Sequence, residues 1–167
     1  MTVRLATYSD LPAIQSVYES ARFYMRANGN KDQWKNDYPS NGLLSSDIFK
    51  NTLYVIEEDR VIHAVFVLAP GPDPTYLKID GSWLTDDDYY VIHRIASDGK
   101  LRGVLSTAIQ VARSKATSLR IDTHKDNKIM QDLLLKMGLA YCGIIHLENG
   151  EPRLAYQILL HETEKDS

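Results

Sequence analysis

The stretch Tyr90–Leu105, YVIHRIASDGKLRGVL, combines residue types that together can hold a phosphate group. A run rich in β-branched residues predicts a strand, and Asp98-Gly99 is a turn signal directly after it. The helix expected next carries Lys100, Arg102 and Gly103 in its first turn. Backbone N–H groups at a helix start lack intrahelical acceptors, and the positive end of the helix dipole attracts anions. These residues therefore predict an anion-binding site.

A second stretch, Arg120–Gly138, repeats the strand–loop–helix arrangement. Its helix is expected to end in Lys136-Met137-Gly138, a basic last turn followed by a glycine stop. Two such units side by side predict an enzyme that holds a phosphate-bearing cofactor between them.

The composition is that of an ordinary globular protein, and it argues against several function classes. The 167 residues are 44% hydrophobic and 25% charged, which predicts one domain over residues 1–167. A formal net charge of −3 argues against general nucleic-acid binding, which needs a basic surface. No apolar run approaches the ~20 residues that span a bilayer, so no membrane partner is expected.

Three further features concern compartment and metals. The single cysteine fits a reducing compartment, and the amino end lacks a signal-peptide pattern, so we expect a cytoplasmic protein. The five histidines lack the spacing of a metal site, so no metal is expected.

Elements that position these residues can be read from hydrophobic periodicity and turn signals. The expected helices are one capped by Ser9-Asp10 and running to about Ala27, then Ser45–Lys50, Lys100–Lys115, and one capped by Asp126 and running to Met137. The expected strands are Thr2–Ala6, Leu53–Glu57, Val61–Leu68, Tyr89–Ser97, Leu119–Thr123, Ala140–Leu147 and Arg153–Leu160.

The order of these elements predicts an α/β fold of the α+β type. Two tight connections, Glu58-Asp59-Arg60 and Glu148-Asn149-Gly150-Glu151, indicate antiparallel hairpins. The strand–helix–strand segment 89–123 indicates a right-handed parallel crossover. We therefore expect a mixed, mostly antiparallel sheet of about six to seven strands flanked by about four helices.

The chain resembles the GNAT N-acetyltransferase superfamily over nearly its whole length. The resemblance rests on the order of elements, the R-I-A strand at Arg94–Ala96, the glycine turn, and the N-x-x-M…K-x-G helix that begins at Asn127. The N-terminal half, with FYMRANGN, DQW and YPS, is similar to small GNAT proteins of Gram-positive bacteria. The resemblance implies a GNAT fold and transfer of the acetyl group of acetyl-CoA to a primary amine of a small molecule or peptide.

The cofactor motif of the superfamily, Q/R-x-x-G-x-G/A, falls on Lys100–Leu105. Lys100 stands for Gln or Arg, Gly103 matches, Leu105 stands where Gly or Ala is usual, and the loop is about two residues shorter than the common form. Backbone amides can still bind a pyrophosphate if Leu105 turns inward, as its apolar register suggests. The residues that the resemblance implies for acetyl-CoA are Ile95, Ser97, Lys100, Leu101, Arg102, Gly103, Val104, Leu105, Ser106, Asn127 and Met130.

His93 is the first candidate for the base that deprotonates the acceptor. Its ordinary pKa of about 6.5 suits such work at neutral pH, and some GNAT enzymes carry a base near this position. The alternative is a structural histidine on a buried strand. Strand alternation places His93 on the same face as Ile95, whose backbone N–H is the expected oxyanion donor. His124 is a second base candidate, with orientation of the Asp126-Asn127 loop as its alternative role.

The general acid stays open. The superfamily often uses a tyrosine midway along the helix after Asn127, but Leu134 occupies that position. Tyr141 and Cys142 follow nearby and could protonate a thiolate, as could water. Cys142 as a nucleophile is disfavoured, because its apolar neighbours indicate a small core residue.

The acceptor site is expected to draw on aromatic residues and one cation. Aromatics beside the acidic run Asp86–Asp88 would favour a cationic amine, whereas Arg26 would favour a carboxylate-bearing acceptor, and the sequence leaves both open. A solvated loop is the alternative for the acidic run. The candidate acceptor residues are Tyr24, Arg26, Trp34, Tyr38 and Trp83.

A GNAT-fold module that binds acyl-CoA or a partner without catalysis is the alternative function. Leu105 and Leu134 favour it, whereas His93 favours chemistry. An edge strand or the C-terminal hairpin could carry a homodimer.

Overall fold

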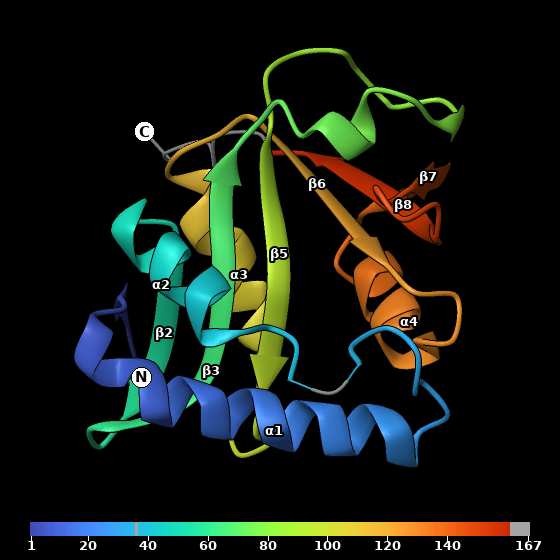
Figure 1. The fold of residues 1–167 in the computed structure, drawn as a ribbon. Coiled ribbons are helices and arrows are strands. Elements are labelled where there is room, and N and C mark those ends of the chain that lie inside the picture. Colours follow the sequence, from blue (N-terminus) through green and yellow to red (C-terminus); the bar gives the residue numbers. More distant parts are fainter. Residues whose placement is uncertain (36, 161–167) are drawn as a thin grey trace. The chain divides into compact units, whose positions relative to one another are not determined.

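The structure is a computed structural model, and it describes residues 1–35 and 37–160. These residues form four α-helices, two 3₁₀ turns and eight strands, and Figure 1 shows their arrangement. The α-helices are α1 (Leu11–Ala27), α2 (Asn41–Phe49), α3 (Val104–Arg113) and α4 (Lys128–Lys136). The strands are β1 (Thr2–Leu5), β2 (Leu53–Glu58), β3 (Val61–Pro70), β4 (Asp80–Gly81), β5 (Tyr90–Ser97), β6 (Ser118–Thr123), β7 (Ala140–His146) and β8 (Pro152–Leu159).

The chain divides into two compact units. Unit 1 contains Met1–Leu68 and His93–Ala108, and unit 2 contains Ala69–Ile92 and Ile109–Ser167. The expectation of one domain stays a prediction. Across the described ranges, no helix is long and apolar enough to cross a bilayer.

In unit 1 the hydrogen-bonded strand order is β1-β2-β3-β5. β1 pairs with β2 and β2 with β3, both antiparallel. The β2–β3 pairing is the hairpin that the Glu58-Asp59-Arg60 turn predicts. The β2–β3 turn consists of Asp59 and Arg60 with φ angles of 51° and 66°. Positive φ at both central residues is typical of the turn whose twist matches antiparallel strands.

The helices of unit 1 bury the expected apolar stripe. Ile14, Val17, Tyr18 and Ala21 of α1 are all buried, one helical turn apart. α2 packs against α1 and β2 (Figure 1).

The predicted start of α2 at Ser45 is wrong. The helix begins at Asn41, because the Ser40 hydroxyl oxygen accepts the N–H of Leu43 at 3.2 Å and caps it. Gly42 in the first turn weakens the helical signal of the sequence there.

An ion pair joins β1 to the start of α1 and leads to a pH prediction. Arg4 Nη1 lies 2.7 Å from Asp10 Oδ2, and this hydrogen bond lowers the pKa of Asp10 from 3.8 to about 2. A lowered pKa means that the pair stabilises the fold above about pH 4 and that this contribution disappears as the pH falls toward 2. The effect is at most about 1 kcal/mol, because both groups contact solvent.

We therefore expect Asp10→Asn to be less stable than the wild type at pH 6, with the difference shrinking as the pH falls through 2, as measured by urea unfolding. Asparagine keeps an oxygen for the Thr7 N–H, which Asp10 accepts at 2.8 Å. Asp59→Asn, in the exposed β2–β3 turn, is the control. A stability difference that does not change with pH would contradict the assignment.

In unit 2 the hydrogen-bonded order is β5-β6-β8-β7-β4. β5 and β6 are parallel, with Tyr90 opposite Leu119, as the crossover prediction requires. β7 and β8 form the expected C-terminal hairpin. Within the residues described, the mixed, mostly antiparallel sheet and the four flanking helices confirm the predicted fold class.

The strand count exceeds the expected six or seven because the sequence does not signal β4. β4 has two residues and pairs with β7, with Gly81 opposite Gly143. A Cβ at Gly81 would lie 2.2 Å from the Cys142 carbonyl oxygen, so only glycine permits this pairing. Two residues carry no periodicity, and the pairing depends on backbone approach alone.

Candidate active site

The loop between β5 and α3 is held by its own side chains and by β3. Asp98 Oδ1 accepts the N–H of Lys100 at 2.9 Å, and Ser97 Oγ accepts the N–H of Gly99 at 3.0 Å. His63 Nδ1 of β3 lies 2.7 Å from Asp98 Oδ2. This pair ties the loop to β3. The Asp98-Gly99 turn signal was visible in the sequence, but His63, 35 residues away, was missed.

Gly103 marks the end of this loop and delays the helix. Its φ of +74° does not occur in an α-helix, so the predicted helix start at Lys100 is wrong and α3 begins at Val104. Lys100, Leu101 and Arg102 therefore belong to the loop. The first helical hydrogen bond runs from the N–H of Thr107 to the carbonyl oxygen of Gly103 at 2.9 Å.

Backbone amides at the start of α3 are placed to bind an anion. The N–H groups of Val104, Leu105 and Ser106 precede the first helical bond and have no intrahelical acceptor. A Cβ built at Gly103 would meet nothing within 4 Å, so there is open space at this position. Leu105 is only 3% exposed, so its side chain points into the protein and does not cover the amides.

The expected alternation of β5 is interrupted at Arg94, which has a φ of +48° in the middle of the strand. This conformation is costly for a residue with a long side chain. The Tyr18 hydroxyl of α1 donates to the Arg94 carbonyl oxygen at 2.7 Å. Arg94 Nη2 lies 2.5 Å from Asp47 Oδ2 of α2, and Asp47 is buried. Two helices of unit 1 therefore hold this point of β5.

The base candidate His93 and the candidate cofactor-binding residues Ile95 and Ser97 surround this irregular point. All three are half-buried in β5. Because the backbone of Arg94 is in the left-handed region, strict alternation cannot be used to assign the side chains of these residues to one face of the sheet or the other. These roles remain proposals.

The candidate acceptor residues of unit 1 differ in exposure. Tyr24 is 56% exposed on α1, and Arg26 near its end is also exposed. Trp34 is buried, with its ring 5.5 Å from Tyr18 and 6.4 Å from Tyr38 between centroids. These three rings form the Trp34 cluster. Trp34 packs inside it, and Tyr38, which is 39% exposed, is the ring of the cluster that contacts solvent.

The remaining candidates lie in unit 2. Asn127, and not the expected Asp126, caps α4, with its side-chain oxygen accepting the N–H of Met130 at 3.1 Å. Met130 is half-buried. Trp83 packs against a buried cluster that includes Tyr76, and its Nε1 donates to the Tyr76 carbonyl oxygen at 3.0 Å. The structure thus assigns Trp83 to unit 2 and the other four acceptor candidates to unit 1.

His124 has a local structural contact. It is 8% exposed at the carboxyl end of β6, and its Nδ1 accepts the N–H of Asp126 at 3.0 Å. This bond supports the alternative role of His124 in orienting the loop before α4.

The candidates for the general acid are separated by burial. Leu134 is fully buried on α4, and Cys142 is 8% exposed. Burial raises the pKa of the Cys142 thiol, which supports its reading as a core residue rather than a nucleophile. Tyr141 is 53% exposed and packs edge-on against Tyr156. Among the described residues, no three His, Cys, Asp or Glu side chains are grouped to hold a metal ion.

Comparison with known proteins gave matches among solved structures, whereas no protein-family model and no curated protein matched the chain. A GNAT-family acetyltransferase from Streptococcus agalactiae is 32% identical, with 96% of each chain covered and a TM-score of 0.87. A proposed acetyltransferase from Staphylococcus aureus is 26% identical over 96% of this chain and 100% of its own, with a TM-score of 0.71.

A third structure has the same fold at lower identity. A proposed acetyltransferase from Salmonella typhimurium, solved with acetyl-CoA as its cofactor, is 17% identical over 99% of this chain and 97% of its own, with a TM-score of 0.57. The agreement with the Streptococcus agalactiae enzyme extends over nearly the full length of both chains. This chain therefore belongs to the GNAT family of acetyltransferases.

Proposed function

We propose that this protein transfers the acetyl group of acetyl-CoA directly to a primary amine of a small molecule or peptide. The observation that carries the proposal is the end of the β5–α3 loop. The backbone of Gly103 is in the left-handed region, and there is open space where its Cβ would lie. The N–H groups of Val104, Leu105 and Ser106 follow it and have no intrahelical acceptors. Such an arrangement suits the pyrophosphate of a coenzyme.

The residues present are compatible with acetyl-CoA. The loop residues Lys100 and Arg102 are exposed and positively charged, and the inward side chain of Leu105 leaves the amides accessible. We assign pyrophosphate binding to the loop and the first turn of α3, and contact with the pantetheine arm to Ile95 and Ser97. When bound, acetyl-CoA supplies a thioester, an activated acetyl group.

Within unit 1, the proposed chemistry centres on β5. His93 is assigned as the base that removes a proton from the acceptor ammonium, because acetyl transfer needs a neutral amine. The backbone N–H of Ile95 is assigned to the developing oxyanion. Tyr18 and Asp47 hold Arg94 between these two groups and so fix their relative orientation.

The acceptor is proposed to contact the exposed residues at the end of α1 and beside the Trp34 cluster. Arg26 favours a carboxylate near the acceptor amine, and Tyr24 and Tyr38 offer exposed rings. The alternative, a module that binds acyl-CoA without catalysis, is favoured by the buried Leu134, because this position cannot supply a general acid.

Thermal unfolding with acetyl-CoA, CoA and NAD tests the cofactor assignment. A ligand at 100 times its dissociation constant stabilises a protein by ~2.7 kcal/mol, enough to raise the midpoint by several degrees. We expect this rise with acetyl-CoA and CoA but not with NAD. No rise with either coenzyme would contradict the proposal, and a rise without turnover of any amine in a panel would favour the non-catalytic module.

His93→Gln tests the assignment of the base. We expect kcat to fall by about 10²–10⁴-fold and the acid limb of the pH–rate profile to disappear, because glutamine cannot accept a proton in this range. Acetylation of an amine found in the panel, followed by thiol release, is the measurement. His146→Gln, on an exposed part of β7, is the control. An unchanged pH–rate profile in His93→Gln would show that His93 is not the base.

A further inference from the structure

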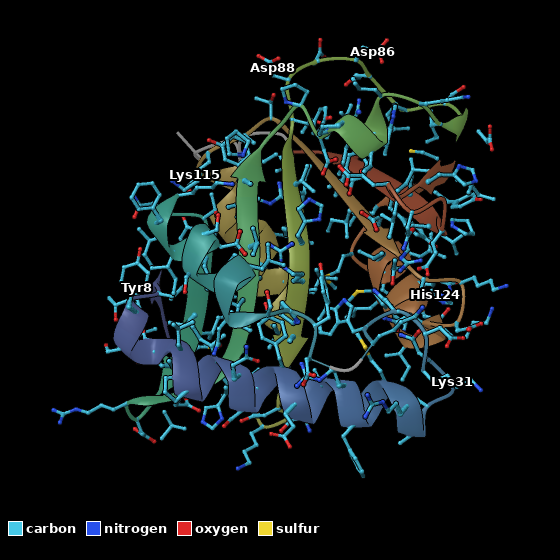
Figure 2. The ribbon with its side chains drawn as sticks, viewed as in Figure 1. Tyr8, Lys31, Asp86, Asp88, Lys115 and His124 are labelled. Carbon is cyan, nitrogen blue, oxygen red and sulfur yellow. The ribbon has the colours of Figure 1, made fainter. Side chains whose placement is uncertain are left out.

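Unit 2 contains a cavity of about 310 Å³ at the amino ends of the parallel strands β5 and β6. Trp83, Tyr89 and the buried Arg120 line it, and the exposed run Asp86–Asp88 forms its rim. Figure 2 shows Asp86 and Asp88 at the opposite end of β6 from His124. The volume is at the lower end of the range of small-molecule sites.

Arg120 has an unusual environment for a charged group. It is 4% exposed, and its guanidinium carbon lies 4.0 Å from the Trp83 ring centroid and 3.9 Å from that of Tyr89. Nη2 donates to the Thr85 carbonyl oxygen at 2.8 Å. Nε is buried and has no hydrogen-bond partner among the described residues. A buried donor without an acceptor is unfavourable. Arg120 also lines the cavity, so a ligand that carries an acceptor group suits this guanidinium.

The charges around the cavity restrict what can supply that acceptor. A carboxylate is the strongest partner for an arginine edge, because the hydrogen bonds are charge-assisted. Burial lowers the pKa of Arg120, and Tyr89 and then Asp86 act against this effect, so a bound carboxylate would act in the same direction as these two groups. A simple anion, however, would pass the three carboxylates of the rim and be repelled by them.

A ligand that carries both a negative and a positive charge fits this combination of a buried arginine and three rim carboxylates. We propose that this cavity binds a small zwitterion of the amino-acid class, with its carboxylate on Arg120 and its ammonium toward Asp86–Asp88. The rings of Trp83 and Tyr89 contact the part of the ligand between the two charges. All these residues belong to unit 2, and the proposal uses none of the residues of unit 1 that are assigned to acetyl transfer.

Tryptophan fluorescence measures this binding directly, without acetyl-CoA. Trp83 is one of two tryptophans and packs on Arg120, so a ligand there changes its emission. The probes are the standard amino acids, with propionate and ethylamine as ligands that carry one charge each. We expect at least one amino acid to give a saturable change below about 10 mM, and neither single-charge probe to do so. Trp83→Phe should remove the change.

Neutralising the three rim carboxylates distinguishes binding in this cavity from weak binding elsewhere on the protein. Asp86→Asn, Asp87→Asn and Asp88→Asn together alter exposed side chains only, so the fold is expected to remain. We expect the triple variant to bind the amino acid at least ten-fold more weakly and to bind propionate, because the repulsion is gone. Glu148→Gln, an exposed change in the β7–β8 turn, is the control. Absence of saturation with every amino acid, or equal amino-acid affinity in the triple variant, would overturn the proposal.

Discussion

Replacing Gly103 with aspartate is expected to weaken acetyl-CoA binding by about 100-fold or more, while the protein stays folded. The new Cβ and carboxylate would occupy the open space beside the amides of α3 and repel a pyrophosphate. Stabilisation by the coenzyme at a concentration that gives ~2.7 kcal/mol in the wild type should become nearly undetectable.

The matched control for this variant is Gly150→Asp. Gly150 lies in the β7–β8 turn with a φ of +86°, and a Cβ there would also meet nothing within 4 Å. Both substitutions pay a similar cost, about 1 kcal/mol, for a side chain in the left-handed region. Without ligand, the midpoint temperature of thermal unfolding should therefore fall equally in both variants. Only Gly103→Asp should lose the rise in this midpoint that acetyl-CoA causes. An equal response in both would show that the loop does not bind the coenzyme.

Removal of the Asp47 carboxylate is expected to destabilise the protein by about 3–5 kcal/mol. Asp47 is buried, and it pairs with Arg94, whose Nε already lacks a partner among the described residues. Asp47→Ala would leave a mostly buried guanidinium, whose side chain is 14% exposed, without its counter-charge, which costs more than the loss of an exposed ion pair. Urea unfolding at pH 7 measures this change.

A double variant shows whether the pair, rather than the volume of the side chains, causes the loss. Arg94→Met removes the charge and keeps an unbranched chain, so Asp47→Ala with Arg94→Met should recover most of the stability lost in Asp47→Ala. If the changes in the free energy of unfolding of the two single variants simply add in the double variant, loss of the ion pair is not the cause of the destabilisation. Arg4→Met, which breaks the ion pairs of Arg4 with Asp10 and Glu57, both in contact with solvent, is the comparison and should cost about 1 kcal/mol or less.

Local patterns were sufficient for most of the fold. The buried stripe of α1, from Ile14 to Ala21, follows from helical spacing, and the β2–β3 hairpin follows from its short polar turn. The parallel pairing of β5 with β6 follows from the helix between them. These features depend on residues close together in the sequence, and their signals repeat over several residues.

Single residues with unusual backbone geometry were not predictable in the same way. A glycine signal at Gly103 was visible, but the left-handed conformation that moves the start of α3 to Val104 is set by the loop around it. Arg94 is an arginine with positive φ inside a strand, which no propensity predicts. The surrounding contacts, from Tyr18 and Asp47, hold it there.

The sequence by itself determined the fold class, the order of the elements and the Asp98-Gly99 turn that follows β5, because periodicity and turn chemistry act over short distances. Tertiary structure alone decided which polar groups meet: His63 with Asp98, Asp47 with Arg94, and Arg120 with the rings of Trp83 and Tyr89. These partners are 31 or more residues apart, and charge or ring type does not specify which of many distant groups will pair. Packing of the helices and strands brings them together and buries them, and burial makes each contact matter for stability or binding.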